Sequence, residues 1–316
     1  MVLFLSNRGK SGLTQLFQLN LPDDVSATSS YPKITQITDY PLSINTLLID
    51  RRGTHVAFSC QVYANLSIEE TAARQAAEKE SGSLVYKFDK LFIRQWDEYI
   101  LGLRYHPFVA QIKKNSNGIY QIVDKPRDVL FGIDSDSPIR QSGGDGMHWS
   151  FSASGKKFAF VRRYDETSQV AWTNNFDIFT IDLTVPDAKP ICITEGNLAS
   201  DVSPIYSPID DNVLLYGAQS VHGYDSDLVK MKLYNGKDNS FQMRFDLIFS
   251  FVQVLIRSTF SMVGILKLRR SHGHKIINHC FSKYKNKDER LFIKFQTSSL
   301  QHQLSIVSLS LVHLKM

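Results

Sequence analysis

Apolar and polar residues alternate in short runs up to about residue 237, and pairs of these runs are joined by polar turns. The clearest pair is HWSFSASGKKFAFVRR at residues 148–163, where Trp149 and Phe151 precede a turn at Gly155 and Phe158 and Phe160 follow it. Period-two alternation on both sides of a short polar turn predicts an antiparallel hairpin. Two strands alone are marginally stable in water, so further structure must cover this hairpin.

The same design recurs along the chain. LLIDRRGTHVAFSC at 47–60 and PIYSPIDDNVLLYGAQ at 204–219 have the same strand, turn and strand pattern. A second kind of strand pair falls between these hairpins, as QLFQLNL and KITQIT, HPFVAQI and GIYQIV, and FDIFTIDL and PICIT, with LVKMKLY beginning a fourth. Each repeat therefore holds four short strands, and repeats of about 40 to 50 residues of this kind are typical of propeller blades.

These repeats predict an all-β fold, a partial β-propeller of about three to four four-stranded blades over residues 1–237. The alternative is a β-sandwich, which also has short strands at regular spacing. A helical insertion interrupts the repeats at residues 61–104. Its segment from Ser67 to Glu80 is rich in helix-forming residues, and Glu70 lies three positions after Ser67, which predicts a helix begun by a capping box.

Residues 238–316 differ in composition from the repeats. They contain no Pro or Trp and carry a net charge of +8, against −3 for residues 1–237. We interpret them as an atypical C-terminal tail, poorly ordered or irregular, of the kind that a shifted reading frame or a translated intron produces. The apolar run at 245–268 is long enough to span a membrane, but Arg257 within it costs about 2.5–3.5 kcal/mol to insert, which disfavours a span.

Composition also limits which metal sites, disulfides, cofactors and partners the sequence predicts. The three cysteines, Cys60, Cys192 and Cys280, are far apart and predict neither disulfides nor a metal site. Nothing in the sequence predicts a cofactor. The basic residues of the tail are better explained as solvated lysines than as a nucleic-acid surface. The short apolar amino terminus is not a signal peptide, so the cytoplasm is the default expectation.

Several ordered segments carry a family resemblance. They are SGSLVYKFDKLFIRQWDEYILGLRYHPFV, GIDSDSPI, AWTNNFDIFTIDL and ITEGNLASDVSPIYSP. Together they resemble the propeller of prolyl-oligopeptidase-family serine peptidases, in particular the dipeptidyl peptidase V and acylaminoacyl-peptidase-like branch, from about Leu3 to Tyr234. The sequence departs from this family at Gln95, where a histidine is usual.

The resemblance implies a two-domain enzyme, in which a propeller that screens peptide substrates precedes an α/β-hydrolase domain with a Ser-Asp-His triad. No Gly-x-Ser-x-Gly occurs in this sequence, so it presents no nucleophile elbow and no catalytic residue is assigned. We therefore expect the gating portion of a serine peptidase that releases dipeptides or acylated residues, without the hydrolase domain and inactive alone.

Two groups of residues are candidates for substrate binding. The resemblance implies that a carboxylate pair such as Glu69 and Glu70 could hold the amino terminus of a peptide; the alternative is an acidic first helical turn that only favours the helix dipole. Arg94, Trp96 and Asp97 form a polar and aromatic group at a strand end. Their alternative role is structural, with Trp96 packed under the insertion and Arg94 paired with Asp97.

Two other functions stay open at this point. The repeats could form a non-catalytic interaction scaffold, as propellers often do. The protein could also be tethered to a membrane through its last 79 residues. An open arc of blades leaves sheet edges unpaired, so we also expect self-association through these edges.

Overall fold

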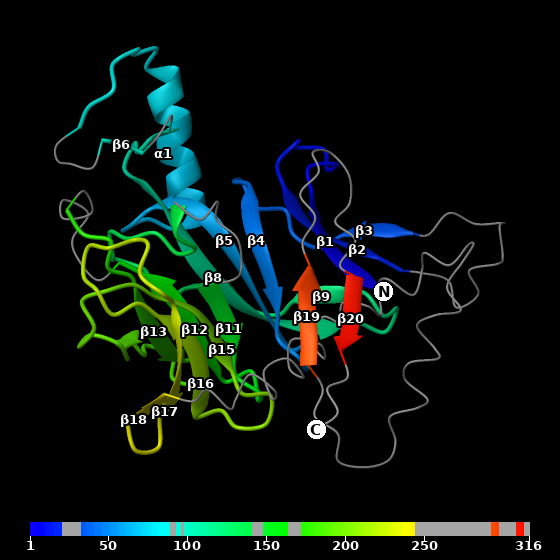
Figure 1. Cartoon of the computed structure of the whole chain (residues 1–316). Coiled ribbons are helices and arrows are strands. Elements are labelled where there is room, and N and C mark those ends of the chain that lie inside the picture. Colours follow the sequence, from blue (N-terminus) through cyan, green and yellow to red (C-terminus); the bar gives the residue numbers. More distant parts are fainter. Residues whose placement is uncertain are drawn as a thin grey trace, which may run out of the picture. The chain divides into compact units, whose positions relative to one another are not determined.

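The computed structural model shows a chain that is mostly β-strand. It describes residues 1–20, 33–88, 93–95, 98–140, 148–163, 172–243, 292–296 and 308–312. Most of the strands in these ranges belong to four antiparallel sheets that follow one another along the sequence (Figure 1).

The first two sheets come from the amino-terminal third of the chain. The strands of the first are β1 (Val2–Ser6), β2 (Gln15–Leu19) and β3 (Ile34–Gln36). The strands of the second are β4 (Ile44–Ile49), β5 (His55–Tyr63), β8 (Leu103–Lys114), β9 (Tyr120–Ile122) and β10 (Arg127–Asp128), with β9 and β10 both paired to the long β8.

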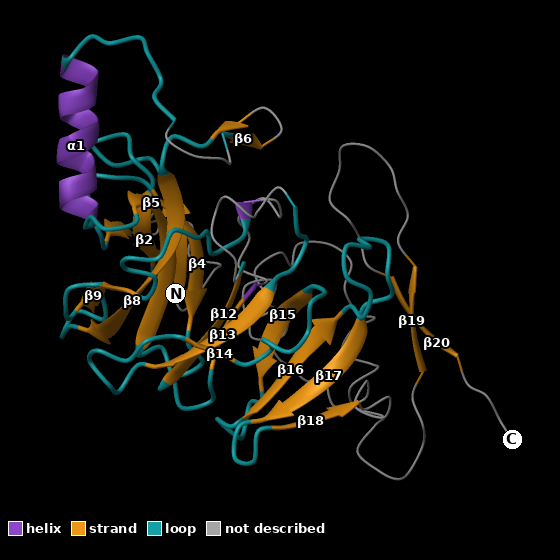
Figure 2. Cartoon of the chain, turned by 90° about the vertical axis from the view of Figure 1, so that its left-hand side faces the viewer, coloured by secondary structure: helices purple, strands orange, loops and turns teal. Residues whose placement is uncertain are grey.

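The next two sheets have four strands each, in chain order. The strands of the third are β11 (Trp149–Phe151), β12 (Lys157–Arg162), β13 (Asp177–Asp182) and β14 (Ile191–Cys192). The strands of the fourth are β15 (Asp201–Tyr206), β16 (Val213–Ala218), β17 (Lys230–Asn235) and β18 (Ser240–Met243). Figure 2 shows these two sheets side by side. The prediction of a partial β-propeller with a short helical insertion is confirmed: the described strands form a series of small antiparallel sheets in chain order, with one short helix between β5 and β8.

The predicted hairpins are confirmed strand by strand. In the third sheet Trp149 pairs with Phe160 and Phe151 with Phe158, as the alternation around Gly155 indicates. The pairs β4–β5 and β15–β16 form in the same way, and each register contains one irregularity. Each of these three blades therefore begins with a hairpin whose tip is a polar turn.

Both faces of the inner strands are buried, which explains their nearly continuous apolar sequences. On β12, Phe158 and Phe160 belong to a core shared with the second sheet, whereas Ala159 and Val161 belong to a core shared with the fourth sheet. β5 likewise turns Phe58 toward the first sheet and Ala57 toward the third. Since alternate residues of a strand point to opposite faces, each sheet supplies half of two cores.

The hairpin tips of neighbouring blades also touch. At the tip of β4–β5 the Asp50 carboxylate accepts hydrogen bonds from the backbone and hydroxyl of Thr54, both at 2.7 Å, and from the His55 backbone at 3.0 Å. Burial alone would raise the pKa of Asp50, but hydrogen bonds from the side chain and backbone of His55, together with those from Thr54, lower it to about 2. Gly155, at the next tip, lies so close that a Cβ atom on it would be 2.5 Å from Asp50 Oδ2. Asp211, at the following tip, accepts hydrogen bonds from the backbone and hydroxyl of Ser154.

A buried polar cluster joins the third and fourth sheets. Asp201 at the start of β15 is fully buried, and its backbone N–H donates to the Phe176 carbonyl at 2.7 Å. Its carboxylate accepts from Asn197 Nδ2 at 3.0 and 3.1 Å. Burial is the main cause that raises the pKa of Asp201 to about 7; the Asp177 charge contributes to this shift, and Asn197 and Lys232 oppose it.

The helical insertion leaves the second sheet between β5 and β8. These two strands stay paired out to Tyr63 and Leu103, so the insertion proper begins and ends just inside the predicted 61–104. It contains α1 (Ile68–Glu80) and the short pair β6 (Arg94–Gln95) and β7 (Glu98–Tyr99). The predicted helix is confirmed: Ser67 is its N-cap, and Ser67 and Glu70 form the capping box.

The end of the chain forms a separate unit. The chain divides into Met1–Met262 and Val263–Met316, and the second unit contains the antiparallel pair β19 (Phe292–Gln296) and β20 (Ser308–Val312). Most of the tail that the sequence analysis sets at 238–316 lies outside the described residues. β18 lies within that range and completes the fourth sheet. No helix of the described part is long and apolar enough to cross a membrane.

The contact between hairpin tips predicts an unequal response to alanine at two glycines. Gly155 has φ +73° and faces Asp50, whereas Gly12 has φ +68° and open space where a Cβ atom would lie. Left-handed backbone costs alanine about 1–2 kcal/mol at either site. Gly155→Ala should lower the free energy of unfolding by about 1–3 kcal/mol more than Gly12→Ala does, because the added methyl group would clash with Asp50. Urea unfolding of the two variants measures the difference; equal losses would show that the tips do not touch.

Asp201 predicts a dependence of stability on pH. An aspartate in the unfolded chain ionises near pH 4, whereas native Asp201 holds its proton up to about pH 7. Between these two pH values the native state therefore binds one more proton than the unfolded state does. Stability falls as the pH rises through this range. In Asp201→Asn this pH-dependent part of the free energy of unfolding, on the order of a few kcal/mol, should vanish. Thermal or urea unfolding from pH 4.5 to 8 tests it, and parallel profiles for the two proteins would refute it.

Candidate functional site

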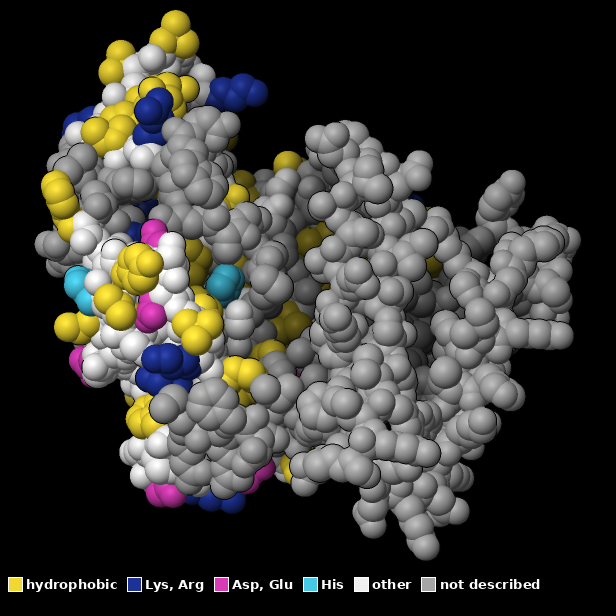
Figure 3. All heavy atoms as spheres, in the orientation of Figure 1, with side chains coloured by type: hydrophobic (Ala, Val, Ile, Leu, Met, Phe, Trp, Pro, Cys, Tyr) yellow, Lys and Arg dark blue, Asp and Glu magenta, His cyan; other side chains and the backbone are white. Residues whose placement is uncertain are grey.

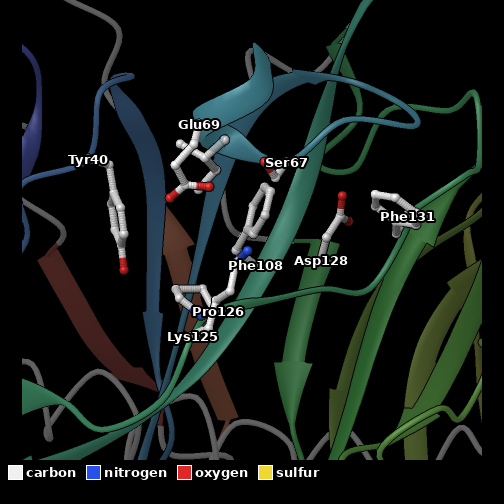
Figure 4. A pocket seen from close by; sticks show the side chains of 9 residues that line it. Tyr40, Ser67, Glu69, Phe108, Lys125, Pro126, Asp128 and Phe131 are labelled. Carbon is white, nitrogen blue, oxygen red and sulfur yellow. The ribbon is translucent and has the colours of Figure 1, made fainter. Parts of the chain in front are cut away.

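A pocket lies where α1 begins, beside the second sheet. It has a volume of about 240 Å³ and is lined by Tyr40, Ser67, Ile68, Glu69, Phe108, Lys125, Pro126, Asp128 and Phe131. Figure 4 shows the Glu69 carboxylate on one side of the Phe108 ring, toward Tyr40, and Asp128 and Phe131 on the other side. The lining is mostly apolar, with three charged side chains, which is the general character of sites for small ligands.

The wall of this pocket is part of the core between the first and second sheets. Phe108 on β8 and Ile68 on α1 are 3% and 4% exposed. The Phe108 ring stacks on Phe58 with centroids 5.8 Å apart, and Phe58 stacks in turn on Tyr40 at 5.4 Å. The wall is therefore fixed by close packing.

Tyr40 is held in place through its backbone. The buried amide of Gln15 accepts from the Tyr40 N–H at 3.0 Å and donates to the Tyr40 carbonyl at 3.0 Å. Burial, followed by the charges of Glu69 and Asp124, raises the pKa of the Tyr40 hydroxyl well above its usual range. The Tyr40 hydroxyl therefore stays neutral and keeps its proton as a hydrogen-bond donor.

The two candidate glutamates have different roles. Glu70 closes the capping box: its Oε2 accepts from the Ser67 N–H at 2.8 Å, and its own N–H donates to Ser67 Oγ at 3.2 Å. The hydrogen bond from the Ser67 backbone lowers the pKa of Glu70. Glu69 lines the pocket, and its carboxylate forms no hydrogen bond or ion pair with the described residues. Of this pair, Glu69 is the carboxylate that is available to a ligand.

Asp128 also lines the pocket, but its carboxylate is already engaged. Oδ2 lies 2.8 Å from His106 Nδ1, and Oδ1 accepts from the Leu130 N–H at 2.8 Å. The other nitrogen of the fully buried His106 ring lies 3.1 Å from the Ile133 carbonyl oxygen. These contacts join β8, β10 and the segment after β10, so Asp128 has a structural role in the pocket wall. Glu69, in contrast, has a carboxylate without a partner among the described residues.

Of the second predicted group, Arg94 is described and does not line this pocket. Arg94 lies on β6, far along the insertion, and its side chain is exposed. Trp96 and Asp97 lie outside the described residues, so the predicted packing of Trp96 and the pairing of Arg94 with Asp97 stay predictions.

The insertion also carries an exposed apolar arm after α1. Leu84, Val85 and Tyr86 are 95%, 80% and 65% exposed, and Tyr86 stacks on Tyr99 of β7 with ring centroids 6.2 Å apart. Hydrophobic side chains gather at this end of the molecule in Figure 3.

Sequence reasoning missed most of the pocket. Tyr40, Lys125, Asp128 and Phe131 come from loops and from a two-residue strand, without a motif around them. One signal was present: His106 lies inside the apolar run HPFVA, and a buried histidine needs a polar partner. Within the described part of the chain, no three His, Cys, Asp or Glu side chains are placed to hold a metal ion.

Comparison with known proteins points to one class of relatives. The chain is 27% identical to dipeptidyl-peptidase 4 of Giardia intestinalis, over 69% of this chain and 32% of that protein. It is 26% identical to dipeptidyl-peptidase 5 of Trichophyton tonsurans, over 48% of this chain and 22% of that protein. It thus spans about a third or less of the length of these curated relatives. No family model matches the chain.

Among solved structures, a TolB-type protein from Agrobacterium tumefaciens aligns with 73% of this chain and 55% of its own, at 16% identity and a TM-score of 0.35. Because this TM-score is low, the relationship rests on the sequence similarity. The resemblance to serine-peptidase propellers is confirmed at this level: the chain is a partial β-propeller that is related in sequence to dipeptidyl-peptidases.

Proposed function

We propose that this chain is the substrate-gating propeller portion of a serine dipeptidyl-peptidase and that Glu69 binds the free amino group of the peptide. The observation that carries the proposal is the Glu69 carboxylate, unpaired among the described residues, at a preformed and mostly apolar pocket. A peptide amino terminus carries a positive charge at neutral pH, and the exposed Glu69 carboxylate is accessible to it at the edge of the apolar lining.

The position of Glu69 on the insertion supports this role. The capping box fixes the first turn of α1, and the apolar side chain of Ile68 anchors the same turn in the core. Glu69 therefore projects from a rigid segment, which limits the entropy lost when it binds a ligand. We further propose that the chain binds peptides without cleaving them, since its sequence contains no Gly-x-Ser-x-Gly.

A second candidate function is a non-catalytic interaction scaffold. It is favoured by the exposed apolar arm that includes Leu84, Val85 and Tyr86. Removing the apolar side chains of this arm would weaken partner binding in a scaffold, and it would leave peptide binding at Glu69 unchanged. The two functions are therefore separable.

The test compares a tripeptide with its N-acetylated form, each titrated into the full chain by calorimetry. The free peptide should bind about tenfold more tightly, because acetylation removes the positive charge that Glu69 attracts. Glu69→Gln should abolish this preference. Glu80→Gln, the same change of charge at the other end of α1, should keep it. Equal binding of the two peptides to the unaltered protein would contradict the proposal.

A further inference from the structure

A second groove lies between the first sheet and the hairpin of β8 and β9. It has a volume of about 550 Å³, and its lining includes Thr35 and Ile37 on or beside β3 and Tyr120 and Ile122 on β9. Within the described part of the chain, no charged side chain lines this groove, whereas several amide and hydroxyl groups do. The groove therefore suits an uncharged ligand that forms hydrogen bonds and also presents apolar surface.

One edge of β9 faces away from β8, which is its strand partner among the described residues. The Ile119 carbonyl accepts from the Asn115 N–H at 2.9 Å, and the Val123 N–H donates to a carbonyl of β8 at 3.0 Å. Backbone groups of successive residues in a strand point to opposite sides. The N–H and carbonyl groups of Tyr120 and Ile122 therefore point away from β8.

A side-chain amide from the first sheet already pairs with this edge of β9. Gln18 Oε1 accepts from the Tyr120 N–H at 2.8 Å, and Gln18 Nε2 donates to the Gly118 carbonyl at 2.9 Å. The amide of Gln18 has the same donor and acceptor as a peptide group, so it pairs with β9 as a neighbouring strand would. Ile122 lies two residues further along the same edge, and its backbone groups have no such partner in the described part of the chain.

The opposite wall of the groove offers another unpaired group. Thr35 lies directly across from Gln18 in the register of β2 and β3, so both side chains point to the same face of the first sheet. The Thr35 hydroxyl oxygen is buried and has no hydrogen-bond partner among the described residues. A ligand that bonds to this hydroxyl would remove the cost of leaving it unpaired.

The edge of β9 also lacks the usual protection against pairing. Exposed edge strands are commonly guarded by charged side chains or proline. The three residues Tyr120–Ile122 include neither, and the next residue, Val123, is 58% exposed. This edge is therefore open to a further strand.

We infer that the outer edge of β9 binds an extended, uncharged peptide segment of a partner protein by strand addition. The segment pairs with the backbone of Ile122, continues the pairing that Gln18 begins, and packs against Thr35 and Ile37. A three-residue strand spans about 10 Å, so the contact involves only a few residues of the partner. This groove shares no residue with the pocket at Glu69, and the inference requires no free amino terminus.

The experiment adds acetyl-Val-Thr-Val-Thr-amide to the full chain and follows amide hydrogen exchange by NMR. The blocked ends of this peptide remove any contribution of a free amino group at Glu69. Saturating peptide should slow exchange of the Ile122 N–H about tenfold or more, because a strand partner then accepts its hydrogen bond. The same peptide with every backbone amide N-methylated should have no effect, because it cannot pair as a strand.

Two proline variants examine the edge itself, with the peptide-induced shift of the Thr35 amide signal as the readout. Ile122→Pro removes the N–H that faces away from β8, where an edge strand tolerates proline, and it should abolish the shift. Ile34→Pro makes the same change at a position of β3 whose N–H faces away from β2 and which does not line the groove. This matched control should keep the shift.

Three results would overturn strand addition at β9. Exchange of the Ile122 N–H that the peptide leaves unchanged is the first, and equal protection by the N-methylated peptide is the second. The third uses maltose, a neutral ligand with many hydroxyl groups. If maltose shifts the signals of Thr35 and Ile122 and the peptide does not, the groove binds hydroxyl-rich ligands instead of a strand.

Discussion

Burial of both faces of each small sheet is the constraint on which the rest of this structure depends. A strand has two sets of side chains, and in β5 and β12 both sets contain apolar residues that are buried in a core, so neither face can be left in water. Sheets placed side by side satisfy this need, because each provides one wall of two successive cores. The fully buried Phe58, Phe158 and Phe160 occupy those walls.

The same constraint explains why the candidate site is where it is. The second sheet has its cores on both sides and a long β5–β8 pair, which gives the insertion a rigid base. Phe108 belongs at once to this base and to the pocket, and Ile68 fastens α1 to it. A single apolar core therefore supports the fold and fixes the position of Glu69.

The sequence predicted what local patterns determine and missed what distant contacts determine. The hairpin at Gly155 and the helix begun at Ser67 follow from residues next to one another, so both were predicted. The capping box predicted from the sequence already involves Glu70, but only the structure shows that Glu69 lines a pocket, because the pocket is built by residues distant in sequence. The His106–Asp128 pair joins residues 22 positions apart, and no local pattern indicates it.

Native-state hydrogen exchange on Phe158→Ala tests the central claim most directly. The substitution leaves a cavity in the core between the second and third sheets, and changes of this kind cost about 3–5 kcal/mol. If neighbouring sheets stabilise each other across shared cores, protection should fall in β5 and β8 as well as in β12. A loss of protection confined to β11 and β12 would show that the sheets fold independently, and the account would be wrong.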